Sequence, residues 1–139
     1  MSAPALPAPG DRLPEATIGP FDAEALQRYA DVSGDDNPLH LDDDLAKMIG
    51  LAAPPVHGMK LFAFFESYLA DWRPDLAVAS ISGKFVQPVL RGETAKLSGR
   101  VLRASPEDGV FVRLFAHGSA RVPAIIGEAT LRMRSGAGA

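Results

Sequence analysis

The feature that most constrains the fold is one long apolar segment, residues 56–71, with the sequence VHGMKLFAFFESYLAD. Its large apolar side chains cannot all lie on one narrow stripe, and a helix that is apolar around most of its girth must be buried. The segment is too short and too interrupted to span a membrane. Trp72-Arg73-Pro74 ends it, because a proline and the residue before it do not continue a helix. The sequence therefore predicts one central helix that the rest of the chain must enclose.

Residues 78–86, 94–103, 110–117 and 124–134 have the composition of β-strands. In the second of these, Thr, Lys, Ser and Arg alternate with Ala, Leu, Gly and Val, which is typical of an antiparallel strand with one buried face. Residues 106–109, PEDG, predict a hairpin turn, and Arg121-Val122-Pro123 predicts a further break. A buried helix followed by antiparallel strands indicates an α+β fold, in which a sheet curled around the helix is the natural arrangement.

The segment before the central helix predicts a short helix and a long functional connection. Residues 21–32 have helical spacing, with Asp22 as the N-cap and Ser33-Gly34 as the end. Residues 35–55 contain Asn-Pro, Gly and Pro-Pro turn signals, with a one-turn helix expected around 43–48. Connections of this length in compact domains are commonly functional.

Length, charge and cysteine content limit the class of protein. The chain of 139 residues predicts one domain over residues 14–134, with a flexible lead-in over 1–13 and a flexible tail over 135–139. A net charge of −3 argues against nucleic acid as a partner. The absence of cysteine excludes disulfides, thiolate nucleophiles and cysteine-type zinc sites. The N-terminus has the pattern of neither a signal peptide nor a membrane span, and we expect a cytoplasmic protein without a membrane partner.

The most informative motif is residues 29–40, YADVSGDDNPLH. It resembles the signature of the MaoC-like (R)-specific enoyl-CoA hydratases, in which an aromatic and small residues precede S-G-D-x-N-P-(L/I)-H. Residues 55–59, PVHGM, look like the second block of this family, and residues 85–93, FVQPVLRGE, resemble its third. The three blocks occur in order, at family-like spacing, and cover the core of the chain.

The resemblance implies a hot-dog fold, a homodimer, and an acyl tunnel near the subunit interface. It implies reversible hydration of trans-2-enoyl thioesters to (R)-3-hydroxyacyl thioesters, with coenzyme A or acyl carrier protein as the substrate carrier. No metal and no redox cofactor is implied. The sequence leaves two alternative functions open: a thioesterase on the same fold, and a non-catalytic subunit that binds acyl thioesters or serves in assembly.

The residues of the motif suit this chemistry independently. Hydration needs a base for water, a source of a proton for Cα, and a donor to the thioester oxygen. Asp35 and His40 offer the acid–base pair across a Pro-containing turn. Which of the two is the base stays open, since they can titrate as one unit.

Gly58 supplies the third part of the catalytic group. At the start of the central helix, backbone N–H groups lack intrahelical acceptors, and the helix dipole adds partial positive charge. A glycine also allows a close approach of substrate to the backbone. By resemblance, the Gly58 N–H polarises the thioester carbonyl, and such a donor contributes roughly 3–4 kcal/mol in related oxyanion sites.

Five further residues are expected to contact the substrate: Asn37, His57, Phe62, Glu66 and Leu69. Three of them have an alternative role, because Asn37 suits the framework of the turn, His57 can cap the helix or pack structurally, and phenylalanines are first of all core residues. Glu66 stands where related hydratases often have a serine. It shares the Gly58 side of the helix, and we expect it to bond to His40 or another polar group and tune the pair. The alternative is a rotated helix in which Glu66 reaches solvent or a dimer interface and Ser67 takes the place of the serine.

Two other clusters have simpler interpretations. The Asp42-Asp43-Asp44 run lacks the glycine and terminal glutamate of a calcium loop, so we expect an acidic turn that caps the next helix. Arg91, Arg100 and Arg103 are candidates for the phosphates of coenzyme A, although dispersed surface arginines usually have no such role.

Overall fold

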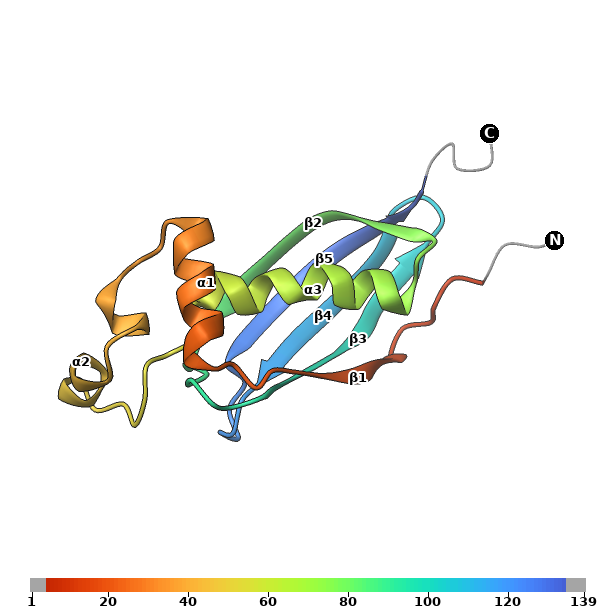
Figure 1. Ribbon diagram of the computed structural model, residues 1–139. Helices are drawn as coiled ribbons and strands as arrows, with labels where there is room; N and C mark the ends of the chain where they lie inside the picture. The colour runs from red at the N-terminus through yellow and green to blue at the C-terminus, as the bar shows by residue number, and fades with distance from the viewer. Residues whose placement is uncertain (1–4, 135–139) are drawn as a thin grey trace.

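One antiparallel five-stranded sheet curls around a single long helix in the computed structural model, which describes residues 5–134 (Figure 1). The sheet order is β1-β3-β4-β5-β2, and every neighbouring pair is antiparallel. The strands are β1 (Arg12–Ile18), β2 (Leu76–Phe85), β3 (Ala95–Ser105), β4 (Gly109–His117) and β5 (Ile125–Met133). This is the predicted hot-dog arrangement. The expected tail, residues 135–139, lies outside the described residues.

The enclosed helix is α3 (Gly58–Trp72), which lies across one face of the sheet (Figure 1). Leu61, Phe65 and Leu69 of α3 are at most 2% exposed and belong to the same core as Leu114 and Leu131 of the sheet. Burying a side chain of this size contributes roughly 1.5–3 kcal/mol. The apolar girth of this segment is therefore explained by enclosure within the sheet, although the helix begins at Gly58 rather than at Val56.

The four predicted strands are confirmed to within two residues at each end, and Ser105 pairs with Gly109 across the predicted hairpin turn. The first strand was not predicted. β1 begins at Arg12, inside the stretch that was expected to be a flexible lead-in, and Leu13 is only 3% exposed. The sequence signal was weak because Pro14 interrupts the strand at an irregularity between Leu13 and Ala16. A proline is tolerated at such a position on an edge strand.

A helical arm precedes α3 and projects from one end of the sheet (Figure 1). It consists of α1 (Ala23–Ser33), the 3-10 turn η1 (Pro38–His40) and α2 (Asp43–Met48). As predicted, Asp22 caps α1, and Gly34 ends it with a φ of 80°, a left-handed conformation that favours glycine. Asp42 caps α2, which fits the predicted acidic turn. Within residues 5–134, none of the helices has the length and apolar character needed to cross a membrane.

Candidate active site

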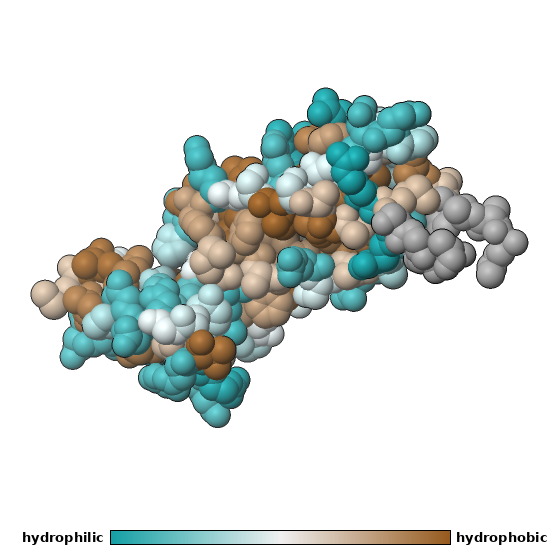
Figure 2. Space-filling view, turned by 90° about the horizontal axis from the view of Figure 1, so that it is seen from above, coloured by the Kyte–Doolittle hydropathy of each residue, from teal (hydrophilic) through white to brown (hydrophobic). Residues whose placement is uncertain are grey.

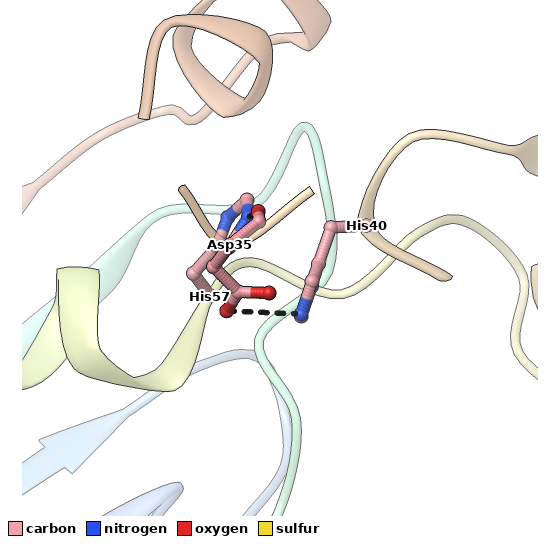
Figure 3. A group of neighbouring side chains, drawn as sticks. All are labelled: Asp35, His40 and His57. Carbon is pink, nitrogen blue, oxygen red and sulfur yellow. Dashed lines mark hydrogen bonds and ion pairs between the residues drawn. The ribbon is translucent and has the colours of Figure 1, made fainter. Parts of the chain in front are cut away.

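Asp35 and His40 face each other at the base of the arm (Figure 3). The distance from His40 Nε2 to Asp35 Oδ2 is 4.0 Å, and the exposed fractions of the two side chains are 16% and 52%. Asp35 follows the end of α1, and His40 closes the η1 turn, whose start is capped by the Asn37 side chain. The Pro-containing turn thus brings the two predicted acid–base groups together at a distance that a bridging water can span.

A backbone contact fixes the orientation of the His40 ring. Its Nδ1 lies 2.8 Å from the carbonyl oxygen of Pro55. A carbonyl oxygen can only accept, so Nδ1 carries a proton and donates it. In the neutral ring, Nε2 is then the nitrogen with a free lone pair, and this is the atom that faces Asp35. His40 Nε2 can therefore accept a hydrogen bond from a water molecule placed between the two side chains.

His57 packs against both Asp35 and His40. It is 1% exposed, and its Nε2 donates to the backbone carbonyl of Asp35 at 3.0 Å. Its ring stacks on His40, with centroids 3.9 Å apart, and contacts Tyr29 on α1 at 4.6 Å. Burial lowers the pKa of His57 below its ordinary value of 6.5, against the raising effect of its bond to Asp35. The structure therefore places a neutral imidazole in contact with both members of the pair, as a structural packing role requires.

Gly58 is the first residue of α3, so its N–H has no intrahelical acceptor. An ideal Cβ built on Gly58 would lie 2.9 Å from Cε1 of Phe85. The ring of Phe85 therefore packs directly against the backbone at the start of the helix. The glycine is required here for close approach, by a protein side chain as well as by the expected substrate.

A cavity of about 440 Å³ lies beside Asp35 and the start of α3, and His40 and His57 are not among the residues that line it. Asp35 and Gly58 lie at its polar end. Its floor is formed by Leu61, Val89 and Ile125, which are at most 2% exposed. Further lining residues, Met59, Phe85 and Val86, are 58%, 52% and 40% exposed. A carbonyl placed at the polar end would meet the start of α3, with an apolar group extending over the floor.

None of the five expected substrate contacts lines the cavity, and His57 has the packing contacts described above. Asn37 serves the framework, since its Oδ1 accepts from the Leu39 N–H at 3.0 Å. Phe62 is partly buried and contacts Phe85, which lines the cavity. Leu69 is fully buried in the core and is not among the residues that line the cavity. Glu66 is exposed and also does not line it, and none of the hydrogen bonds of residues 5–134 joins Glu66 to His40.

The contact between Asp43 and Arg91 lies near the site and could not be predicted from the local sequence. Both guanidinium nitrogens of Arg91 donate to the carboxylate of Asp43 on α2, at 2.6 and 2.7 Å. The bond to Arg91 lowers the pKa of Asp43 from its ordinary value. Nearby, the Arg91 N–H donates to the Pro54 carbonyl. These bonds fasten the arm that carries the pair to the loop between β2 and β3, and they occupy an arginine that was considered for coenzyme A.

Asp35, His40 and His57 each offer one potential metal-ligand atom, all within 4.8 Å of one another. Their orientation does not suit chelation. A histidine binds a metal through a lone pair in the plane of its ring. The two stacked rings are inclined by only 23°, so their lone pairs run in nearly parallel planes and do not converge on one point. The cluster fits acid–base chemistry better than metal binding.

Comparison with known sequences identifies relatives over most of the chain. The family described as "MaoC like domain" matches residues 8–110. An (R)-specific enoyl-CoA hydratase of Aeromonas caviae is 33% identical over 118 residues, which are 81% of this chain and 87% of that protein. A mitochondrial 3-hydroxyacyl-(acyl-carrier-protein) dehydratase of Arabidopsis thaliana is 36% identical over 84 residues, 60% of this chain.

The matched region is only a part of some relatives. It spans 49% of the Arabidopsis dehydratase, and 16% of a peroxisomal multifunctional enzyme type 2 of Drosophila melanogaster that is 34% identical over 98 residues, 68% of this chain. Among solved structures, the A. caviae (R)-hydratase involved in PHA biosynthesis superimposes with a TM-score of 0.83 at 25% identity, covering 95% of this chain and all of that one. An unliganded (R)-hydratase of Pseudomonas aeruginosa gives 0.79 at 28% identity, covering 90% of this chain and 81% of that one.

Proposed function

The chain belongs to the MaoC-like domain family, and on that premise we propose that it is a hydro-lyase that reversibly hydrates trans-2-enoyl thioesters to (R)-3-hydroxyacyl thioesters. The observation that carries the proposal is the position of His40 Nε2, which lies 4.0 Å from the carboxylate of Asp35, a residue that lines the same cavity as Gly58. An acid–base pair and an unpaired N–H at one cavity are the parts that this reaction needs.

In the hydration direction, the pair holds a water molecule and removes one of its protons. The water oxygen bonds to Cβ, and the electrons of the Cα–Cβ double bond move to Cα and the thioester oxygen. The Gly58 N–H stabilises the enolate charge that develops on this oxygen. A proton returned from the pair to Cα completes the addition. Asp35 and His40 act as one coupled unit in this scheme, and the proposal does not divide the two proton transfers between them.

The proposal includes no metal and no redox cofactor, because the addition of water to a conjugated thioester needs neither electron transfer nor a cation. The substrate carrier is coenzyme A or acyl carrier protein. Arg103 lies over the ring of Phe111, 4.2 Å from its centroid, on a different part of the sheet from the cavity, so it does not support recognition of coenzyme A at this site. The cytoplasmic location expected from the sequence is part of the same proposal.

We propose a homodimer formed along β2. Both edge strands of the sheet lack a second strand partner within the described residues, but they differ in protection. β1 is short and carries Pro14 and a bulge, which oppose edge-to-edge pairing, whereas β2 has ten residues and one charge, Lys84. Figure 2 looks on to the β2 side and shows apolar atoms across the middle of this face. Pairing along β2 would cover the free edge and the exposed mouth of the cavity.

A thioesterase on the same fold is the main rival, since it would use the same cavity and would attack the carbonyl carbon instead of Cβ. The experiment that separates the two reactions follows crotonyl-CoA with two signals in one sample. Hydration removes the enoyl absorbance without release of a free thiol, whereas thioester hydrolysis releases the coenzyme A thiol. Thiol release at the rate of absorbance loss would overturn the proposal, and the absence of either signal would favour a non-catalytic thioester-binding subunit.

A further inference from the structure

The ring of Phe62 fills the space between α3 and the edge strand β2. Its partner there is Gly83, at which an ideal Cβ would lie only 2.6 Å from Cε2 of Phe62. Real Cβ atoms essentially never approach other atoms this closely. The phenyl ring can therefore occupy its position only because residue 83 has no side chain.

Phe62 is also held by two other aromatic rings. Its centroid lies 6.3 Å from that of Phe85 and 6.0 Å from that of Phe65, both in edge-to-face geometry. Such arrangements are favourable beyond the apolar area that they bury. Phe85 lines the cavity next to Gly58, whereas Phe65 is fully buried. Phe62 thus stands behind the cavity wall and fills the space between this wall and the core.

The other residues of α3 that face the sheet leave no space for a longer ligand between the helix and the sheet. Leu61, Phe65 and Leu69 are at most 2% exposed and fill the space between the helix and the sheet. A second cavity, of about 290 Å³, lies on the β1 side of the helix, where Phe64 and Trp72 line it. The buried side chains of Leu61, Phe65 and Leu69 lie between this cavity and the site at Asp35 and Gly58. An acyl chain that begins at Gly58, outgrows the cavity and stays between the helix and the sheet therefore extends along β2, where Phe62 lies against Gly83.

We propose that Phe62, which packs against Gly83, is the residue that limits the acyl chain of the substrate to short lengths. The inference rests on the proposed function for the position of the thioester, and it adds a substrate class: short-chain enoyl thioesters of the crotonyl type. A longer chain must displace the Phe62 ring from its contacts with Phe65, Phe85 and Gly83. Because interiors are close-packed, such a displacement is costly. The limit is steric and does not involve the charge of Glu66.

The test compares kcat/KM for trans-2-octenoyl-CoA with that for crotonyl-CoA. In the natural protein, crotonyl-CoA should be strongly preferred. Phe62→Ala should raise the octenoyl-to-crotonyl ratio by about tenfold or more, the scale of discrimination in apolar pockets. Phe62→Leu, which keeps more of the core filled, should raise the ratio in the same direction. The matched control is Phe64→Ala, an equal truncation on the β1 side of the same helix, and it should leave the ratio unchanged.

Calorimetric binding of butyryl-CoA and octanoyl-CoA, which cannot react by hydration, provides a second readout. If the protein shows no hydration but Phe62→Ala still improves octanoyl-CoA binding relative to butyryl-CoA, the proposed reaction is wrong and the chain-length limit stands. If the folded Phe62 variants leave both the kinetic ratio and the binding preference unchanged, or if the natural protein accepts both chain lengths equally, the role of Phe62 is refuted.

Discussion

The imidazole rings of His40 and His57 stack with their centroids 3.9 Å apart and their planes inclined by 23°. His40 faces the carboxylate of Asp35, and His57 donates to the backbone carbonyl of Asp35. The stacked rings therefore both contact Asp35, one at its side chain and one at its backbone. A positive charge on His57 would oppose the protonation of His40 at this distance. Burial lowers the pKa of His57, which favours the neutral form of this ring beside His40.

The first prediction concerns stability against pH. The pKa of His57 is lower in the folded chain than its ordinary value of 6.5, so the unfolded chain binds more protons below that pH. The stabilising contribution is complete above pH 6.5 and is lost as the pH falls from 6.5 through the lowered pKa. We expect the midpoint of thermal unfolding to fall between pH 7 and about pH 5, and His57→Gln to lose much of this dependence.

The control is His117→Gln, since His117 is a partly exposed residue at the end of β4. This variant should keep the pH dependence of the natural protein. An unfolding midpoint whose pH dependence is the same in His57→Gln and in the natural protein would show that His57 is not the group that titrates.

The second prediction concerns the catalytic pair. Asp35→Asn and His40→Ala should each lower the turnover of an enoyl thioester by at least about 10²-fold, the usual scale for a lost acid–base group. Both residues lie on the loop after α1 and outside the core, so circular dichroism should show an intact fold. Near-normal turnover in a folded variant would remove that residue from the pair.

The third prediction concerns the attachment of the arm. Arg91→Lys keeps the charge near Asp43 but loses the two-pronged geometry of the guanidinium group. We expect turnover to fall by about tenfold with the fold intact, because a displacement of about 1 Å at a catalytic site costs up to about 10²-fold in rate. Arg100→Lys, at an exposed position of β3, is the control. Equal turnover in the two variants would show that the Asp43 contact does not position the site.

The fourth prediction concerns the assembly. Light scattering at assay concentration should give about twice the chain mass of 14.7 kDa, because the free edge of β2 favours pairing with a second copy. A mass of one chain that persists at concentrations where the protein is fully active would contradict the dimer and would leave the mouth of the cavity open to solvent.

Features with a strong local pattern could be predicted from the sequence. The apolar girth of residues 56–71 indicated the enclosed helix, which the structure has at Gly58–Trp72, and alternation and turn residues indicated four of the five strands. The pair at Asp35 and His40 followed from the motif, and the structure brings both residues together. β1 was missed because its strand pattern contains a proline at a bulge, and its pairing with β3 depends on residues far along the chain.

The remaining differences arise where sequence spacing does not fix the surroundings. Counting from Gly58 predicts that Phe62, Glu66 and Leu69 share one side of the helix, but the helical period does not predict how deeply each side chain is buried. Leu69 is fully buried and Glu66 is exposed, so the expected contact of Glu66 with His40 is not formed. The Asp43–Arg91 contact joins residues 48 positions apart and left no local signal.

The stereochemistry of the hydration product is the decisive measurement for the proposed role of Asp35 and His40. The claim is that the Asp35–His40 pair delivers water to Cβ from one face of a thioester held at Gly58. Crotonyl-CoA should be incubated with the purified full chain, and the 3-hydroxybutyryl product should be analysed on a chiral phase. If the pair acts in this way, we expect the (R) product, and we expect Asp35→Asn to lose it. An (S) product, a racemic product, or the same (R) product from folded Asp35→Asn at an undiminished rate would contradict the proposed role of the pair.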